Sequence, residues 1–289
     1  KMATAAEVLI DTIHQWGVEV IFGMPGDGIW GIMQALEKRK DRIRFIQVRH
    51  EEAAALMACG YAKFTGKIGA CLATSGQGGI HLLSGLYDAK LDGQPVLALT
   101  GTQIRDLTDT FGQQDVALDR VFMDVAIYNT RIMDPPHVEN VAGLACRAAV
   151  SQRGVAHITF PMDIQSLPAR AGATLRTASQ HSASVFAQRA RLPYEGDLRQ
   201  AAEILNAGKK IVILAGRGAL GASTELELMA EILGAPIVKA LLGKAAVPDT
   251  SPYTTGCLGP YGTWPSNAAI QSCDTLLRVG TSFPSTESL

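Results

Sequence analysis

The chain has 289 residues, of which 47% are hydrophobic and 18% are charged, and its formal net charge is -1 at pH 7. This length predicts about two domains, each with enough apolar residues to bury a core. The balanced charge excludes the strongly basic surface that is typical of nucleic-acid-binding domains.

The first half of the chain alternates short apolar runs with helical patterns. Thr4-Ala-Ala-Glu7 is a capping box and predicts the start of a helix. Strands are predicted at residues 18–22, 43–48, 68–73, 95–100 and 155–160, with helices at 29–38, 52–64 and from the turn at 74–79 to about 89. Such alternation is typical of an α/β domain with a parallel sheet, here placed at residues 1–165.

Residues 166–192 are rich in Ser, Ala, Arg and Gln and show little periodicity, so we predict a linker. The alternation then resumes in a second predicted domain, residues 193–289. Helices are predicted at 198–206 and 224–233, the latter with a capping box at Thr224, and strands at 211–215, 236–240 and 275–279. The predicted fold class is therefore α/β, with two doubly wound parallel-sheet domains. Because the sequence stops soon after the last strand, we expect the second, Rossmann-like domain to be incomplete at its C-terminus.

Five cysteines form no Cys-x-x-Cys pair and lie in apolar surroundings, which predicts buried free thiols in a reducing compartment. No signal peptide opens the chain, and no apolar run reaches the about 18 residues that a membrane-spanning helix needs. We therefore expect a cytoplasmic protein with no integral membrane segment.

Six short motifs follow one another in the first domain. They are Phe22-Gly-Met-Pro-Gly26, Arg49-His-Glu51, Gly60-Tyr-Ala62, Thr74-Ser-Gly-Gln-Gly78, Gln94-Pro-Val96 and Pro161-Met-Asp163. In this order and spacing, residues 4 to about 165 resemble the pyrimidine-binding domain of thiamine-diphosphate enzymes of the pyruvate oxidase and acetolactate synthase group.

Glu51 is the catalytic residue that this resemblance implies. From the residues alone, Glu51 and Glu52 are two acids at a helix N-terminus, where the helix dipole already favours them. The resemblance matches Glu51 to the family's catalytic glutamate. Its carboxyl group would hydrogen-bond the aminopyrimidine ring of thiamine and promote the tautomer that removes the C2 proton.

The resemblance also implies contacts on the thiamine-diphosphate or substrate side from Pro25, Gly26, Thr74, Gly78, His81 and Gln113. His81 could equally be a histidine in the first turn of a helix. Gln113 belongs to Phe111-Gly-Gln-Gln114, where the family has Phe-Gln-Glu, so this segment departs from the pattern.

Gly26-Asp27-Gly28 looks like the loop that binds a metal-bound diphosphate. Mg²⁺ needs near-octahedral oxygen ligands, and in thiamine-diphosphate enzymes an Asn follows such an Asp roughly 25 to 30 residues further on. The first Asn in this chain is Asn129. We therefore interpret Asp27 as a turn residue near a helix N-terminus, predict no metal ligand in this chain, and expect the Mg²⁺ ligands in a domain that this sequence lacks.

Residues 216–221 form a literal Gly-x-Gly-x-x-Gly turn between a strand and a helix, which by itself indicates a dinucleotide site. The acidic residue that should end the next strand is replaced by Lys239. The segment resembles the central domain of the same enzymes, and in the oxidase and synthase branches that domain holds FAD. The implied FAD residues are Gly216, Arg217, Gly218, Leu242, Gly243, Gly262, Thr263, Gly280 and Thr281. A purely structural role for these glycines is the alternative.

The sequence thus predicts an enzyme that uses thiamine diphosphate, Mg²⁺ and FAD to decarboxylate pyruvate or a similar 2-oxo acid and pass electrons through the flavin. His81 and Phe283-Pro284 resemble the pyruvate-oxidising branch more than the synthase branch. The alternatives are an acetolactate synthase-like carboligase with structural FAD and a non-catalytic two-domain regulatory or binding protein. The resemblance also implies a homodimer or homotetramer with its active site at the subunit interface, and a chain that is inactive alone.

Overall fold

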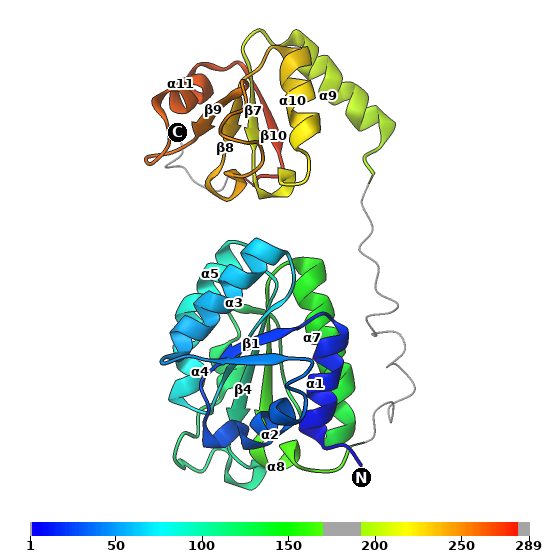
Figure 1. The fold of residues 1–289 in the computed structure, drawn as a ribbon, viewed down its shortest axis with the longest axis vertical. Helices are drawn as coiled ribbons and strands as arrows, with labels where there is room; N and C mark the ends of the chain where they lie inside the picture. Colours follow the sequence, from blue (N-terminus) through cyan, green and yellow to red (C-terminus); the bar gives the residue numbers. More distant parts are fainter. Residues whose placement is uncertain (1, 170–191, 283–289) are drawn as a thin grey trace. The chain divides into compact units, whose positions relative to one another are not determined.

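The computed structural model describes residues 2–169 and 192–282. The chain divides into two compact units, residues 1–189 and 190–289, each built on its own parallel sheet (Figure 1). Phe283-Pro284 and most of the predicted linker, residues 170–191, lie outside the described residues.

The first unit is a six-stranded sheet in the order β2-β1-β3-β4-β6-β5, with every pair parallel. Its strands are β1 (Val20–Gly23), β2 (Arg44–Gln47), β3 (Gly69–Ala73), β4 (Val96–Thr102), β5 (Ala126–Arg131) and β6 (Val155–Pro161). Every residue of β3, β4 and β6 is buried. That burial explains why these strands read as continuous small and apolar runs, since helices cover both faces of the sheet.

Two helical layers cover the faces of this sheet, as Figure 1 shows. One layer contains α1 (Ala5–Gln15), α2 (Trp30–Lys38), α7 (Val138–Gln152) and α8 (Met162–Gln165), and the other α3 (Glu51–Thr65), α4 (Gln77–His81), α5 (Leu83–Leu91) and α6 (Leu118–Val121). Short 3-10 turns complete the unit: η1 (Asp27–Ile29), η2 (Arg105–Leu107) and η3 (Pro135–His137).

The predicted start of α1 is confirmed, because the side chain of Thr4 accepts a hydrogen bond from the backbone N–H of Glu7. The helix predicted after Gly79 is interrupted at Leu82, which separates α4 from α5. His81 therefore ends a short helix rather than lying in the first turn of a long one. The first four residues of the predicted linker pack on this unit: the N–H of Ala5 donates to the carbonyl of Leu167.

The second unit is a four-stranded parallel sheet in the order β10-β7-β8-β9. Its elements are α9 (Glu195–Ala207), β7 (Ile211–Ala215), η5 (Arg217–Ala219), α10 (Ser223–Leu233), β8 (Ile237–Lys239), η6 (Leu241–Gly243), β9 (Thr254–Cys257), α11 (Trp264–Ser272) and β10 (Thr275–Val279). Leu226 of α10 packs in the core on one face, and Ile270 of α11 on the other. The predicted α/β class with two parallel-sheet domains is confirmed.

The capping box predicted at Thr224 is wrong. Helix α10 begins one residue earlier, at Ser223, and its N-cap is Ala222, which offers no side-chain hydrogen bond. Thr224 thus has helical backbone, whereas a capping residue needs a non-helical conformation.

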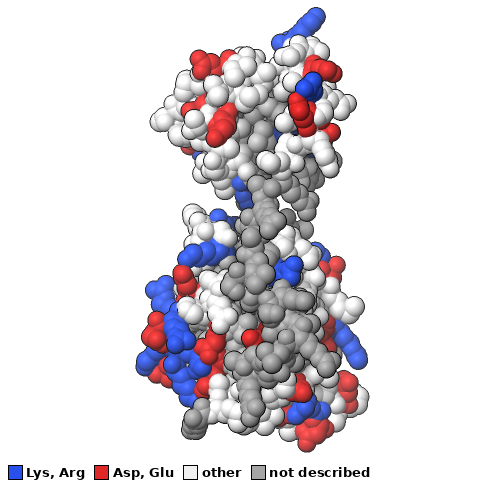
Figure 2. All heavy atoms as spheres, turned by 90° about the vertical axis from the view of Figure 1, so that its right-hand side faces the viewer, with Lys and Arg blue, Asp and Glu red and all other residues white. Residues whose placement is uncertain are grey.

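All five cysteines are free thiols, as predicted, but only three are buried, because Cys257 and Cys273 are partly exposed. Burial raises the pKa of the Cys59 thiol to about 12 and also raises the pKa of Cys71 and Cys146, so these three stay protonated and unreactive. Acidic and basic side chains are interspersed on the face drawn in Figure 2. None of the described helices combines the length and the apolar character needed to cross a bilayer.

A chain of polar side chains crosses the otherwise apolar core of the first unit. The imidazole of His157 on β6 is fully buried and stacks on Phe122 with ring centroids 3.8 Å apart. Its Nε2 lies 2.8 Å from Oγ1 of Thr100, and its Nδ1 lies 2.8 Å from Oδ1 of Asn129. Desolvation by burial lowers the pKa of His157 to about 3, so the ring is neutral in the folded protein.

Gly69 and Gly60 make a matched pair that tests the packing of α3 on the sheet. A Cβ at Gly69 would lie 2.0 Å from the carbonyl oxygen of Ala58, whereas a Cβ at Gly60 meets nothing within 4 Å. Gly69→Ala should destabilise the first unit by about 2 kcal/mol or more, because backbone would have to move. Gly60→Ala should stabilise it by about 0.5 kcal/mol, because a helix interior favours Ala. Urea unfolding measures both, and equal effects would contradict the packing.

His157 makes the stability of the first unit depend on pH. Its pKa is about 3 when folded and ordinary, near 6.5, when unfolded, so between these values only the unfolded chain binds the proton. This contribution is therefore present above about pH 6.5 and is lost as pH falls toward 3, at up to about 1.4 kcal/mol per pH unit. His157→Gln should flatten that slope, and the half-buried His14 serves as the matched His→Gln control. Urea unfolding between pH 7 and pH 5 reads the slope. The assignment fails if wild type and His157→Gln lose stability in parallel.

Candidate functional site

The loops that follow β1, β2 and β3 meet at the carboxyl edge of the first sheet. They carry the Gly26–Gly28 turn, Glu51 at the start of α3, and the turn from Thr74 to Gly78. These strands are neighbours in the sheet, which brings together residues that are far apart in sequence. Ligands of open parallel sheets bind outside this edge.

Glu51 has the most distinctive environment of these residues. Its side chain is 9% exposed, and its Oε2 lies 2.9 Å from Nδ1 of His81. No described residue hydrogen-bonds the other oxygen, Oε1. A Cβ at Gly78 would stand 3.1 Å from Oε1, so the glycine keeps that side of the carboxyl group open. The structure therefore leaves one Glu51 oxygen able to bond a ligand that approaches past Gly78.

His81 and His50 flank Glu51 and present their rings to solvent. The rings stack with centroids 4.6 Å apart and an interplanar angle of 25°. Nδ1 of His50 also accepts the N–H of Glu52, so His50 caps α3. Ligand atoms of His50, Glu51 and His81 lie within 4.8 Å of one another, the one such group among residues 2–169 and 192–282. Because imidazole lone pairs lie in the ring plane, these nearly parallel rings cannot both aim at one ion, and the arrangement does not fit a metal.

Asp27 is a turn residue, as the sequence predicted. Its Oδ1 accepts the N–H of Gly28 at 2.9 Å, and Oγ1 of Thr74 accepts the same N–H at 3.1 Å. Asp27 is the first residue of η1. Gly26 is needed here because a Cβ would lie 2.5 Å from that of Thr74. The Gly-Asp-Gly motif thus ties the loop after β1 to the loop after β3.

No hydrogen bond between the described residues joins Gln113 to Glu51. Pro25 and Gln113 are exposed, and Gln113 is contacted through its backbone carbonyl by the amide of Gln103. Gln114 reaches the site loop instead: its Oε1 accepts from Oγ of Ser75 at 2.8 Å. Ser75 and Gln114 were missed from the sequence, although the departure from Phe-Gln-Glu at Phe111–Gln114 marked the segment.

The glycines of the second unit bring three loops together at the carboxyl ends of β7, β8 and β10. A Cβ on Gly216 would lie 2.5 Å from the Gly280 carbonyl and from Cβ of Thr281, and one on Gly218 would lie 2.7 Å from Cα of Gly280. Gly243 packs on Ala215 in the same way. This is the switch point of the sheet, where β7 is followed by neighbours on opposite sides.

The remaining residues suggested for FAD have structural roles or surround this point. Gly262 packs against the carbonyl of Cys257, and Thr263 caps α11. Arg217 is half-buried and Leu242 is 37% exposed. The space beside Gly216, Gly218 and Gly280 is filled by the chain's own backbone. A flavin could contact only the exposed loop residues around these glycines.

Lys239 occupies the position where a nicotinamide-nucleotide site would have an acid. It is fully buried at the end of β8, and its ammonium group pairs with Asp249. Asp249 also pairs with Lys244, and the lysines hold the pKa of the Asp249 carboxyl down at about 2. A ribose hydroxyl would find no carboxylate acceptor at this strand end.

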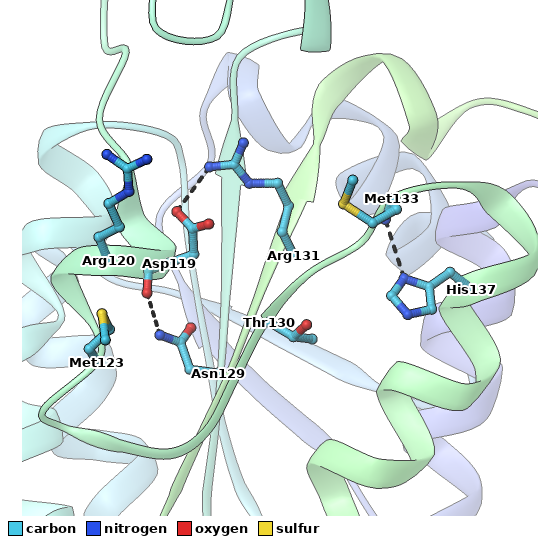
Figure 3. Close-up of a pocket in the computed structure, with 8 residues that line it drawn as sticks. All are labelled: Asp119, Arg120, Met123, Asn129, Thr130, Arg131, Met133 and His137. Atoms are coloured by element: carbon cyan, nitrogen blue, oxygen red, sulfur yellow. Dashed lines mark hydrogen bonds and ion pairs between the residues drawn. The ribbon is translucent and has the colours of Figure 1, made fainter.

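A groove of about 620 Å³ lies away from Glu51, beside the edge strand β5 (Figure 3). Elements α6, β5 and η3 line it with a mixture of charged, polar and thioether side chains: Asp119, Arg120, Met123, Asn129, Thr130, Arg131, Met133 and His137. Strands β5 and β2 form opposite edges of the sheet, so this groove and the Glu51 site are separate.

Comparison with known proteins places both units. Residues 3–123 match the model of the thiamine pyrophosphate enzyme N-terminal TPP binding domain, and residues 198–289 match the central domain of the same enzymes.

Three relatives illustrate the range of similar proteins. A putative thiamine pyrophosphate-containing protein YdaP of Bacillus subtilis is 38% identical over 97% of this chain and 48% of its own length. A pyruvate oxidase of Lactiplantibacillus plantarum is 35% identical over 98% of the chain and 46% of its length. An acetolactate synthase of Mycobacterium bovis is 32% identical over 98% and 45%.

The chain thus spans about half the length of these three relatives. The order of the two matched domains agrees with the two parallel sheets and with the motif series of the first unit. The chain belongs to the thiamine pyrophosphate enzymes, whose N-terminal and central domains it carries.

Proposed function

We propose that the protein decarboxylates pyruvate or a similar 2-oxo acid with thiamine diphosphate and passes the electrons through FAD. The observation that carries this proposal is the Glu51 carboxyl group, nearly buried, held by His81 on one oxygen and open past Gly78 on the other. A buried carboxyl with one open oxygen suits a hydrogen bond to a ring nitrogen of the aminopyrimidine.

Within this proposal, each residue of the site has a defined task. Glu51 holds and shares a proton with the bound ring, and His81 fixes the orientation of the carboxyl group. Gly78 lets the ligand approach, while Thr74 and Gly26 hold the two loops together. The bound thiamine diphosphate supplies the carbon nucleophile and the electron sink for loss of CO₂.

The second unit would bind FAD around the switch point, with Arg217 and Leu242 as contacts beside the packed glycines. Mg²⁺ would be held by residues outside this sequence, and a homodimer or homotetramer would complete the active site at a subunit interface. Exposed apolar side chains on α3 and α5, with Met57 40% and Leu91 80% exposed, support such an interface. We propose a cytoplasmic location.

Glu51 and Glu52 provide a matched test of the catalytic assignment. Glu52 is the next residue of the same helix and accepts a hydrogen bond from Ser84 at 2.7 Å. In the protein expressed from its whole reading frame, Glu51→Gln should lower kcat by about 10²–10⁴-fold, because proton transfer to the cofactor ring is lost. Glu52→Gln should leave kcat within about threefold, because its carboxyl group serves only α5.

Pyruvate decarboxylation assays measure both variants, with circular dichroism to confirm folding. Wild-type turnover in Glu51→Gln would refute the assignment of Glu51. No turnover of any 2-oxo acid by the wild type, with cofactors added, would favour the non-catalytic binding protein instead.

Flavin spectroscopy separates the oxidase from the carboligase, which remains the second candidate because an acetolactate synthase is also similar over nearly the whole chain. Anaerobic addition of pyruvate to the flavin-loaded whole protein should bleach the visible flavin absorbance if electrons pass to FAD. Unchanged absorbance together with acetolactate formation would assign the carboligase and a structural FAD. The absence of bound flavin would refute the FAD proposal for the second unit.

A further inference from the structure

The groove beside β5 has features of a binding site that the proposed catalytic reaction does not use. We propose that it binds a small organic oxyanion, a carboxylate or a phosphate carried on a short carbon skeleton. This inference is independent of the proposed function, because none of the groove residues belongs to the Glu51 site.

The groove holds two guanidinium groups, those of Arg120 and Arg131, and one carboxylate, that of Asp119 (Figure 3). Arg131 donates from Nη2 to Oδ1 of Asp119 at 2.9 Å, and its buried Nε has no hydrogen-bond partner among the described residues. Arg120 is exposed, and its guanidinium group forms no ion pair or hydrogen bond with any described residue. The groove therefore has a surplus of positive charge and of guanidinium donors, which are well suited to oxyanions.

The carboxylate side of the groove is fixed by the core. The amide of Asn129 donates to the backbone carbonyl of Asp119 and accepts, through Oδ1, a contact from the buried His157. The polar chain that crosses the sheet from Thr100 thus ends at Asp119 and Arg131. A binding site held by buried hydrogen bonds loses little conformational freedom when a ligand binds.

The opposite wall supplies a further donor and apolar contacts. Nδ1 of His137 accepts the N–H of Met133 at 3.3 Å, so in the neutral ring the proton is on Nε2, which can donate. Met133 on this wall is 60% exposed, and Met123, on the side of Arg120 and Asn129, is 71% exposed (Figure 3). Thioether side chains adapt to varied apolar shapes, so the groove fits a ligand with a short carbon part as well as an anionic group. Its volume of about 620 Å³ is in the range of small-molecule sites.

The position of the groove in the fold supports the same conclusion. Arg131 is the last residue of β5, and His137 lies in the loop that follows, so the groove opens at the carboxyl edge of the sheet. Strand β5 is an edge strand, and no described strand covers its outer side. Open parallel sheets bind ligands at this edge, here at the end opposite to β2.

Isothermal titration calorimetry at constant ionic strength tests the proposal on the whole protein. Inorganic phosphate and propionate are the two probes, and we expect at least one to bind saturably with a dissociation constant of about 1 mM or tighter. Arg120→Gln should weaken that binding by about tenfold, because a charge-assisted hydrogen bond is lost. Arg44→Gln is the matched control: Arg44 is an exposed arginine on β2, the other edge strand, and its loss should leave the affinity unchanged.

The two titrations distinguish phosphate-bearing from carboxylate ligands. Binding of phosphate alone identifies phosphate-bearing ligands, and binding of propionate alone identifies carboxylates. No saturable binding of either probe, or equal binding by wild type and Arg120→Gln, overturns the proposal. An equal loss in Arg44→Gln would show nonspecific charge attraction and would overturn it as well. Because the side chain of Arg120 is exposed and forms no ion pair or hydrogen bond with the described residues, its substitution is not expected to unfold the protein.

Discussion

The close approach of backbone to backbone, possible only where a Cβ is missing, is the constraint on which both units depend. A side chain at Gly101 would place its Cβ 2.2 Å from the carbonyl of Gly28, so the end of β4 could not lie against the turn after β1. In the second unit Gly216, Gly218 and Gly280 fill one another's missing side-chain space. These contacts position the loops at the carboxyl edges of both sheets, where the candidate sites lie.

The same edge of the first sheet carries two different chemistries. Near β2 a single nearly buried carboxyl group, that of Glu51, lies beside Gly78 and is kept by His81 in one orientation. At the far edge, beside β5, guanidinium groups exceed carboxylates, and methionine side chains add apolar contacts. The chain of hydrogen bonds through His157 and Asn129 connects the central strands to that far edge, so the Asp119 side of the groove is anchored to the core.

Membership of the thiamine pyrophosphate enzymes explains the order of the domains, and the contacts of individual residues add detail that the motifs do not carry. Gln114, and not Gln113, contacts the loop of Ser75. The Gly-x-Gly-x-x-Gly turn of the second unit is followed by a strand that ends in a buried lysine, whose partner Asp249 is also bound to Lys244. The Gly-x-Gly-x-x-Gly motif therefore indicated the correct type of domain, whereas Lys239 and its contacts argue against a nicotinamide-nucleotide site there.

The sequence alone determined the helices and strands that are marked by a short, local residue pattern. The bounds of β7 and β10 were predicted as the structure has them, because each is an apolar run of strand length between turn residues. The start of α1 was equally clear, since a capping hydrogen bond spans only three residues. Glu51 was recognised because it belongs to an ordered series of motifs, and the structure places it nearly buried.

Tertiary structure decided everything that depends on distant partners. Strands β5 and β9, and helices α7 and α11, were not predicted. Both strands are only partly buried and contain several polar residues or a glycine, so neither shows the apolar run that marks a strand in the sequence. The open oxygen of Glu51, the stacking of His50 on His81 and the surplus charge of the groove bring together residues up to tens of positions apart. Sequence alone determined which segments are strands and helices with strong local patterns, and only the folded chain decided which side chains meet, because a contact depends on the packing of both partners.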